Sequence, residues 1–168
     1  MSNTLEMQVL SRKINALDRS LRSKNLVIKG LLEWYDEMPI DIETAVRATF
    51  AKTGFENVEI DVAYRLGPQR GVERPVLVKL VKEKDAKAIF SNRARLGKGS
   101  SVFIQEDMTK EDRLAWYKLR EAFKSIKENE SGLKASIRKG GMVVWKHGEN
   151  VGYYRYDKEK KEVVKIEN

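Results

Sequence analysis

The sequence predicts an α+β protein that begins with one long helix and continues as two small mixed domains. Three observations lead to this prediction. Residues 1–24 place apolar side chains at alternating steps of three and four, which is the spacing of a coiled-coil stripe. Residues 25–105 contain four strand patterns and two helical patterns in the order β-α-β-β-α-β. Residues 106–168 open with a helical pattern and continue as strands separated by glycine turns, an α-β-β-β unit.

The opening helix has a narrow apolar stripe, formed by Met7, Leu10, Ile14, Leu17 and Leu21. A helix of about three heptads is marginal in water when it is alone. We therefore expect the helix to self-associate as a coiled coil over residues 1–24. The alternative is an amphipathic helix that packs on its own domain.

The β-α-β-β-α-β domain begins with the segment NLVIKGL, in which Leu26 and Ile28 alternate with Val27 and Lys29. The remaining elements are expected as a helix capped by Asp41 and stopped at Gly54, strands over residues 58–65 and 76–81, a helix over residues 84–96, and a strand over residues 101–105. In the second strand Val62 and Tyr64 alternate with Ala63 and Arg65, and Arg65 is expected to face outward. Topology of this kind occurs in proteins of many functions, so it predicts a fold and not an activity.

The second domain is expected to open at Thr109, which caps a helix that runs toward Asn129. Two strands follow, over residues 133–138 and 142–146, joined by a turn at Lys139-Gly140-Gly141. A third strand is expected over residues 151–156. The rest of the chain, with Val163, Val164 and Ile166, is expected to be a charged tail.

Composition favours a polyanionic partner. The 168 residues carry a formal net charge of +8, with a pI near 9.6, which suits nucleic acid or an anionic membrane surface. The absence of cysteine excludes disulfides, zinc knuckles and thiol catalysis. No apolar run is long enough to span a bilayer and no signal peptide follows Met1, so we expect a soluble, intracellular protein.

Basic residues dominate the segment from Arg65 to Lys98. On an open sheet face, outward-facing Arg65, Lys79 and Lys29 would neutralise phosphates, and Arg70 and Arg74 would form a basic loop. In the second domain Arg113 opens the helix. The hairpin region interleaves cations and rings: Lys134, Arg138, Lys139, Lys146 and Arg155 with Trp145, Tyr153, Tyr154 and Tyr156. At least half of these rings are expected in the core. The alternative is a solvated charged face without a ligand.

Residue patterns for catalysis are missing. His147 is the only histidine, and no triad or metal-ligand spacing accompanies it. The acids Glu106, Asp107, Glu111 and Asp112 are explained by the charge preference of a helix N-terminus. We expect neither an enzyme nor a cofactor.

The segment NLVIKGL is similar to the first strand of the RNA-recognition module, except that Val27 stands where that module usually has a base-stacking ring. A coiled coil ending at NLVIKGL, followed by VAYRLG, RPVLVKLV, EDMTKEDR and GGMVVW, resembles the first-open-reading-frame proteins of LINE-type retrotransposons and the related baculovirus few-polyhedra family. The resemblance implies a trimeric coiled coil (trimer favoured over dimer), an RRM-like domain and a small C-terminal domain. It implies that single-stranded RNA binds between the two domains.

The resemblance also implies functional positions. Arg65 matches the arginine at the family's second-strand end, with Tyr64 in place of a histidine, and Arg74 and Lys79 match basic positions of the loop and third strand. Arg93, Arg95 and Lys98 match a basic turn, and Arg113 matches the arginine that opens the C-terminal helix. We therefore expect a sequence-tolerant binder of single-stranded RNA, and of single-stranded DNA, with a nucleic-acid chaperone role in a cytoplasmic and nuclear retrotransposon ribonucleoprotein. The alternative is a coiled-coil assembly protein of the few-polyhedra type.

Overall fold

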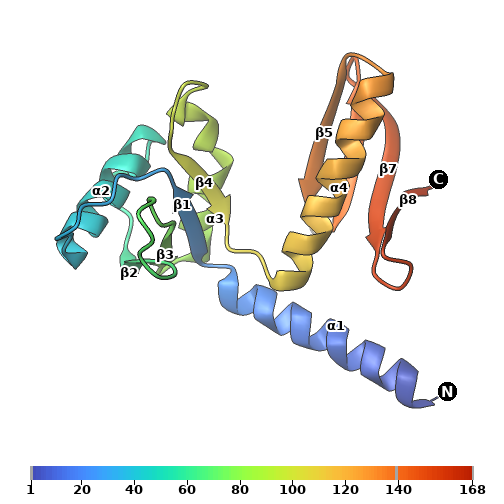
Figure 1. Cartoon of the computed structure of the whole chain (residues 1–168), viewed down its shortest axis with the longest axis horizontal. Helices are drawn as coiled ribbons and strands as arrows, with labels where there is room; N and C mark the ends of the chain where they lie inside the picture. The colour runs from blue at the N-terminus through green and yellow to red at the C-terminus, as the bar shows by residue number, and fades with distance from the viewer. Residues whose placement is uncertain (1, 139, 168) are drawn as a thin grey trace. The chain divides into compact units, whose positions relative to one another are not determined.

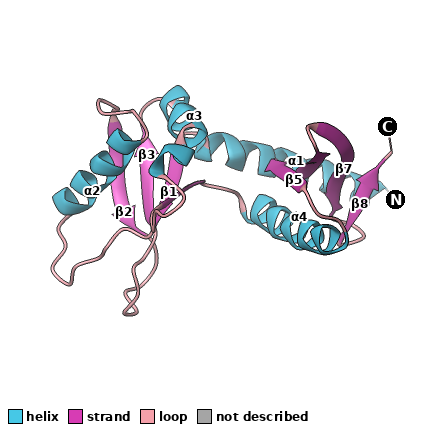
Figure 2. Cartoon of the chain, turned by 90° about the horizontal axis from the view of Figure 1, so that it is seen from above, coloured by secondary structure: helices cyan, strands magenta, loops and turns pink. Residues whose placement is uncertain are grey.

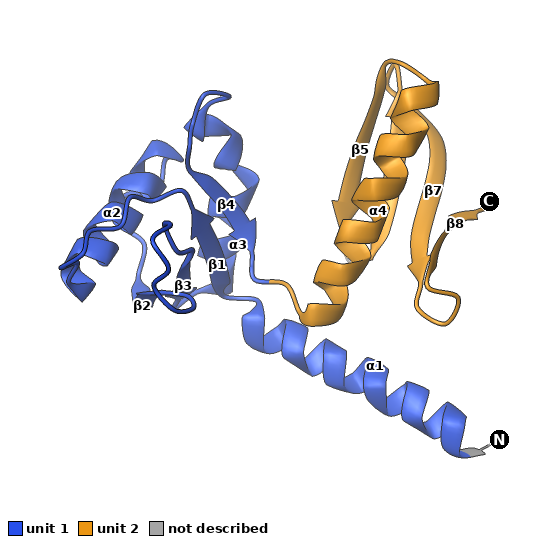
Figure 3. Ribbon diagram, viewed as in Figure 1, with its two compact units in different colours: residues 1–107 blue, residues 108–168 orange. Residues whose placement is uncertain are grey.

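The computed structural model describes residues 2–138 and 140–167, which divide into two compact units, Met1–Asp107 and Met108–Asn168 (Figure 3). Each unit contains one four-stranded antiparallel sheet, with two helices packed on the first sheet and one helix on the second (Figure 1). The α+β class that the sequence predicts is thereby confirmed, as is the N-terminal helix. The unit boundary lies two residues after the expected one.

The elements of the first unit are α1 (Ser2–Arg22), β1 (Asn25–Lys29), α2 (Pro39–Lys52), β2 (Ile60–Arg65), β3 (Val76–Leu80), α3 (Glu83–Ser91), η1 (Arg93–Leu96) and β4 (Phe103–Glu106). The sheet order is β2-β3-β1-β4, and all three strand pairs are antiparallel. The helices α2 and α3 lie on one face of this sheet (Figure 2). Neither α2 nor α3 covers the other face.

The core of the first unit fills the space between the sheet and these two helices. Alternate residues of β1 and β3 point into it, among them Leu26, Ile28 and Val78, and Phe50 and Ile89 enter from the helices. All five are at most 1% exposed. Burying side chains of this size stabilises a fold by roughly 1.5–3 kcal/mol each. The period-two pattern of β1 therefore decides which sheet face is covered.

Gly30 ends β1 because no other residue fits there. Its φ is +84°, and a Cβ atom at this position would lie 1.9 Å from the carbonyl oxygen of Ser101. The chain can then turn so that Leu31 returns to the core. The glycine of NLVIKGL is thus a steric requirement of the contact between β1 and the segment before β4.

The helix α2 begins earlier than the sequence predicts. Its N-cap is Met38 and Pro39 is its first residue, so the prediction that Asp41 is the cap is wrong. Proline suits this position because its missing N–H has no partner in a first turn. Asp41 still satisfies the helix end from inside, since its carboxylate accepts the Met38 N–H at 2.8 Å. At the other end the C-cap is Thr53, followed by Gly54 with a φ of +95°.

The predicted helix over residues 84–96 is divided in the structure. The helix α3 ends at Ser91, and η1 follows after Asn92, whose side-chain amide donates to the Ala88 carbonyl oxygen at 2.8 Å. Asparagine competes for backbone groups in this way and weakens a continuous helix. The expected apolar side is nevertheless correct, because Ala86 and Ile89 are buried and Phe90 and Leu96 are packed against the core.

The second unit consists of α4 (Lys110–Asn129), β5 (Leu133–Arg138), β6 (Gly141–Lys146), β7 (Glu149–Asp157) and β8 (Glu162–Ile166), with the sheet order β5-β6-β7-β8. Thr109 caps α4 as predicted, and its hydroxyl accepts the Asp112 N–H at 3.1 Å. The core between α4 and one face of the sheet contains Leu119, Leu133, Met142 and Val144.

The strand β8 corrects the prediction of a charged tail. Residues 162–166 pair with β7 along their whole length, and Val163 packs against the core of the second unit. The charged run from Lys158 to Glu162, directly before the valines, makes this segment look like a tail in the sequence. Pairing with β7 satisfies the backbone hydrogen-bonding groups of this segment. The local sequence does not show that such a partner strand is present.

The helix α1 exposes the predicted stripe. Met7, Leu10, Ile14, Leu17 and Leu21 are between 57% and 80% exposed. At its C-terminal end Arg22 donates to the carboxylates of Asp18 at 2.8 Å and Asp107 at 2.9 Å. Asp18 raises the pKa of Arg22 through this hydrogen bond, with Asp107 contributing. None of the helices within residues 2–138 and 140–167 has the length and apolarity needed to cross a membrane.

Candidate nucleic-acid interface

The face of the first sheet opposite α2 and α3 is the candidate interface, and we call it the open face. Strand register assigns residues to it, since directly paired residues of antiparallel strands point to the same side. Val27 pairs with Leu77 and with Gln105, and Leu77 pairs with Tyr64. The paired positions of the open face are Asn25, Val27, Lys29, Val62, Tyr64, Leu77, Lys79, Phe103 and Gln105. Among these positions the only charged side chains are the two lysines.

A β-bulge decides the orientation of β2. Ile60 pairs with Leu80 but Val62 pairs with Lys79, so the strand contains one extra residue relative to β3. A one-residue shift moves every following side chain to the opposite face. Val62 and Tyr64 therefore lie on the open face, 41% and 40% exposed, and Arg65 lies on the covered face. The predicted orientation of this strand end is wrong for this reason.

The open face has two rings whose place there the sequence pattern did not predict. Tyr64 is on the edge strand β2 and Phe103, 58% exposed, is on the opposite edge strand β4. Neighbouring residues of a strand point to opposite faces, so burial of Ile104 predicts that Phe103 lies on the open face. Tyr64 could not be placed in this way, because the bulge is not visible in the pattern of residues 58–65.

The predicted cations Lys29 and Lys79 do lie on the open face. Lys29 is exposed and sits directly opposite Phe103, whereas Lys79 is half-buried opposite Val62. In the described part of the chain neither ammonium group has a carboxylate partner. Both charges are therefore available to an anionic ligand.

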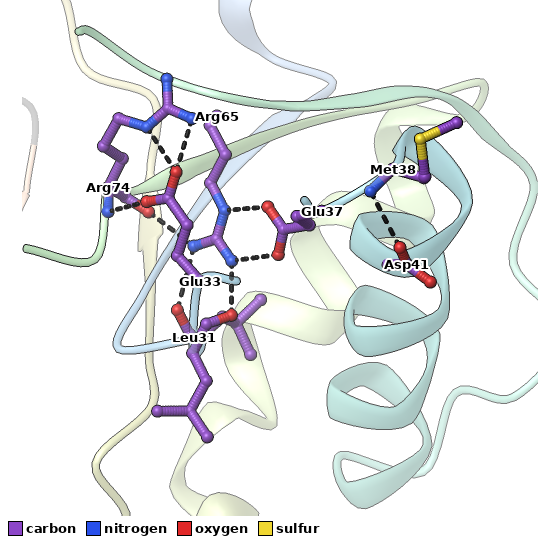
Figure 4. A network of polar contacts seen from close by, with 8 residues as sticks. Leu31, Glu33, Glu37, Met38, Asp41, Arg65 and Arg74 are labelled. Atoms are coloured by element: carbon purple, nitrogen blue, oxygen red, sulfur yellow. Dashed lines mark hydrogen bonds and ion pairs between the residues drawn. The ribbon is translucent and has the colours of Figure 1, made fainter. Parts of the chain in front are cut away.

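Arg65 is not available to a ligand, and its predicted role as an outward-facing cation is wrong. Its side chain is 3% exposed and forms an ion pair with Glu37, Nη2 to Oε1, at 2.6 Å (Figure 4). Nε donates to the other oxygen of Glu37, and the remaining N–H groups donate to the carbonyl oxygens of Leu31, Leu32 and Arg74. All five guanidinium N–H groups are thus used inside the unit.

Arg74 also binds the loop between β1 and α2. Its Nε and Nη2 donate to Oε1 of Glu33 at 2.8 and 2.5 Å, and its own N–H donates to Oε2 (Figure 4). These hydrogen bonds lower the pKa of Glu33 and raise the pKa of Arg74. Together Arg65 and Arg74 fasten residues 31–37 to the two ends of the β2–β3 connection.

The other basic residues of the first unit lie outside the open face's paired positions. Arg70 is exposed in the β2–β3 loop. Arg95 donates to the Thr53 carbonyl oxygen at the end of α2, at 3.3 Å, and Arg93 lies 3.9 Å from the Phe90 ring centroid. Lys98 is exposed in the turn before β4. Arg93 and Arg95 therefore contact residues of the helix layer, and none of the three cations of this turn is at a paired position of the open face.

Ion pairs neutralise part of the basic segment 65–98. Arg65, Arg74 and Lys82 pair with Glu37, Glu33 and Glu59, which precede this segment in the sequence. Lys87 pairs with Glu83 at 2.5 Å. Part of the basic segment thus holds the first unit together, and the cations left for a ligand are fewer than the sequence implies.

The second sheet divides its aromatic residues between two faces. Tyr154 and Tyr156 pack with the core under α4, so half of the four predicted rings are on the core side. Register places Trp145 and Tyr153 on the opposite face, together with Lys134, Arg138 and Arg155. Lys146 faces the α4 side, where it pairs with Glu130 at 2.5 Å. Arg113 is exposed in the first turn of α4, and Lys139 lies outside the described residues.

His147 is exposed in the two-residue turn between β6 and β7, with a φ of +52°. Within residues 2–138 and 140–167 no cluster of three or more histidine, aspartate or glutamate side chains could hold a metal ion. No protein-family model matches the chain, and a comparison with curated proteins finds no match.

Proposed function

We propose that this protein is a non-enzymatic, sequence-tolerant binder of single-stranded nucleic acid, RNA in the first place. The observation that carries the proposal is the open face, where Lys29 and Lys79 are the only charged residues at paired positions and have no carboxylate partner in the described chain. Two lysines without a carboxylate partner attract phosphates, and contacts to phosphates carry no base information.

The arrangement of the first unit supports an RRM-like module. Its element order β1-α2-β2-β3-α3-β4 and its sheet order β2-β3-β1-β4 leave one sheet face free of the module's own helices. RRM domains bind single-stranded RNA on such a face. The second unit offers a sheet face with Trp145, Tyr153 and Arg155, on which strand register also places Asp157 and Glu162. We propose that both faces contribute to binding, and that the resemblance to the LINE-type first-open-reading-frame proteins extends to a chaperone role in a retrotransposon ribonucleoprotein.

Self-association through α1 is part of the proposal. The stripe Met7, Leu10, Ile14, Leu17 and Leu21 is exposed and keeps heptad spacing, which suits packing against the same stripe of further copies. A trimer is favoured over a dimer by the family resemblance. Multiple copies would raise the affinity for a long strand, because each bound copy holds the next close to it.

A salt titration tests the proposed binding. Fluorescence anisotropy of a labelled single-stranded RNA should give a log K that falls linearly with log salt concentration, with a slope of about −0.7 per phosphate contacted. Replacing Lys29 or Lys79 by Ala should weaken binding to all sequences alike and flatten the slope by about one contact each. Lys84→Ala is the matched control, because Lys84 is an exposed lysine on α3. Absence of salt-dependent binding would refute the proposal.

The alternative function is that of an assembly protein whose coiled coil recruits a protein partner. The exposed stripe of α1 favours it independently of the open face. It requires that the oligomer forms while affinity for oligonucleotides is negligible. The same titration, paired with light scattering, separates the two functions.

A further inference from the structure

The open face contains two ring–cation pairs, one near each edge of the sheet. Phe103 on β4 is directly opposite Lys29 on β1. Tyr64 on β2 is opposite Leu77, and Lys79 is two residues further along β3 on the same face, so it is a diagonal neighbour of Tyr64. A ring offers a surface for a base, and the adjacent ammonium group offers a partner for the phosphate beside it.

The two rings are too far apart to hold one base between them. Tyr64 and Gln105 belong to one row of paired residues that crosses all four strands, and Phe103 is two residues from Gln105. Three strand spacings and a two-residue offset correspond to about 16 Å between the ring-bearing backbone positions. Leu77 and Val27 form an apolar floor between them, 7% exposed and half-buried respectively.

Resting on the proposed function, we infer that the open face binds unpaired bases at two separate stacking subsites, one on Tyr64 and one on Phe103. The sheet thus carries its rings on the edge strands β2 and β4, whereas the central position Val27 has none. The ligand class is a single strand whose bases are free to leave their own stack. A duplex keeps its bases stacked inside and cannot use these rings.

A nucleic-acid strand fits this face better than a second copy of the chain does. The face combines exposed apolar area at Val62, Tyr64 and Phe103 with two lysines and, at its paired positions, no acid. A second copy of the same face would bring like charges together, which disfavours an interface between copies through this surface.

The test compares strands with and without bases. Full-length wild-type protein is titrated with a labelled single-stranded RNA of mixed sequence, with an abasic strand of the same length and charge, and with the duplex. The wild type should prefer the base-bearing strand. Tyr64→Leu and Phe103→Leu keep an apolar side chain but remove the ring, and each should raise the Kd of the base-bearing strand by about fivefold or more. The Kd of the abasic strand should stay within about twofold, since phosphate contacts carry no base information.

Conservative variants and a control ring complete the experiment. Tyr64→Phe and Phe103→Tyr retain the rings, so they should bind like the wild type. Tyr35→Ala removes a ring that is 96% exposed in the loop after β1 and absent from the open face, and binding should not change. Far-ultraviolet circular dichroism confirms that each variant is folded.

The outcomes distinguish the subsites from the function. If no strand binds in a salt-dependent manner, the proposed function fails. If base-bearing and abasic strands bind equally, or if the Leu variants weaken both to the same extent, the stacking subsites are refuted while phosphate binding stands. An equal loss of affinity for Tyr35→Ala also overturns the assignment of the subsites to the open face. A change in the molecular mass of the oligomer for the Leu variants does the same.

Discussion

The guanidinium of Arg65 donates all five of its N–H groups to partners within the first unit. It fastens the loop between β1 and α2 by holding two backbone carbonyl groups and the Glu37 carboxylate. A buried pair of this kind contributes little net stability compared with apolar residues, but removing one partner leaves the other charge buried and unpaired. The role of Arg65 is therefore architectural.

Replacing Arg65 by Ala or Lys should destabilise the protein. Removal of one partner of a buried ion pair costs about 3–5 kcal/mol, and lysine cannot supply five donors in the same geometry. Urea unfolding followed by circular dichroism measures the loss. Lys79→Ala is the control on the neighbouring strand and should unfold at nearly the wild-type urea concentration. A stable Arg65→Ala variant with weakened RNA binding would contradict this role.

Glu33 should make the protein sensitive to acid. Arg74 lowers the pKa of Glu33 below its value in the unfolded chain. The ionised form then stabilises the fold above the unfolded pKa, and this contribution is lost as the pH falls through the folded pKa. Glu33→Gln should be less stable than the wild type at neutral pH, with a difference that shrinks on acidification. Urea unfolding at a series of pH values measures it, and exposed Asp36→Asn serves as the control. A difference that is constant with pH would contradict the prediction.

At the scale of elements, β2 shows how a single extra residue changes a surface. The pattern of residues 58–65 is consistent with Tyr64 facing inward, and only the pairing with β3 reveals the bulge after Ile60. With the bulge, a ring moves to the open face and an arginine moves to the covered face. Val27 on the central strand β1 thus has no ring, whereas the edge strands β2 and β4 each carry one.

The stripe on α1 should control self-association. Replacing Ile14 and Leu17 by Gln removes two central stripe residues, which are 65% and 66% exposed in one copy of the chain, so folding of the two units should not change. Light scattering should show oligomers for the wild type and monomers for this variant. Arg12→Gln with Lys13→Gln, on the same helix but outside the stripe, should remain oligomeric. A monomeric wild type would exclude the coiled coil.

On the scale of the whole molecule, some basic residues form internal ion pairs and others are left for a ligand. Four basic residues of the segment 65–98 form ion pairs within the first unit, whereas Lys29 and Lys79 remain without carboxylate partners in the described chain. The net charge of +8 therefore overstates what any one surface offers to a ligand. The two units each present a sheet face with rings and cations, which is consistent with the proposed binding of a strand.

The sequence alone determined the features that depend on local pattern. The α+β class, the helix α1 with its stripe, the strands β1, β3, β5 and β6, and the Thr109 cap all follow from periodicity and from the chemistry of helix ends and turns. These signals are local, because hydrophobic spacing, capping side chains and glycine turns act within a few residues. The open-face positions of Lys29 and Lys79 follow from the same alternation.

Tertiary structure decided the features that depend on pairing between distant segments. The bulge in β2, the strand β8, and the partners of Arg65 and Arg74 arise from contacts across the sheet and between loops. A buried arginine and a solvated one have the same local sequence signature, and they differ only in the acceptors that the fold brings to them. For this reason the sequence could name the basic residues, but only the fold shows which of them are left for a ligand.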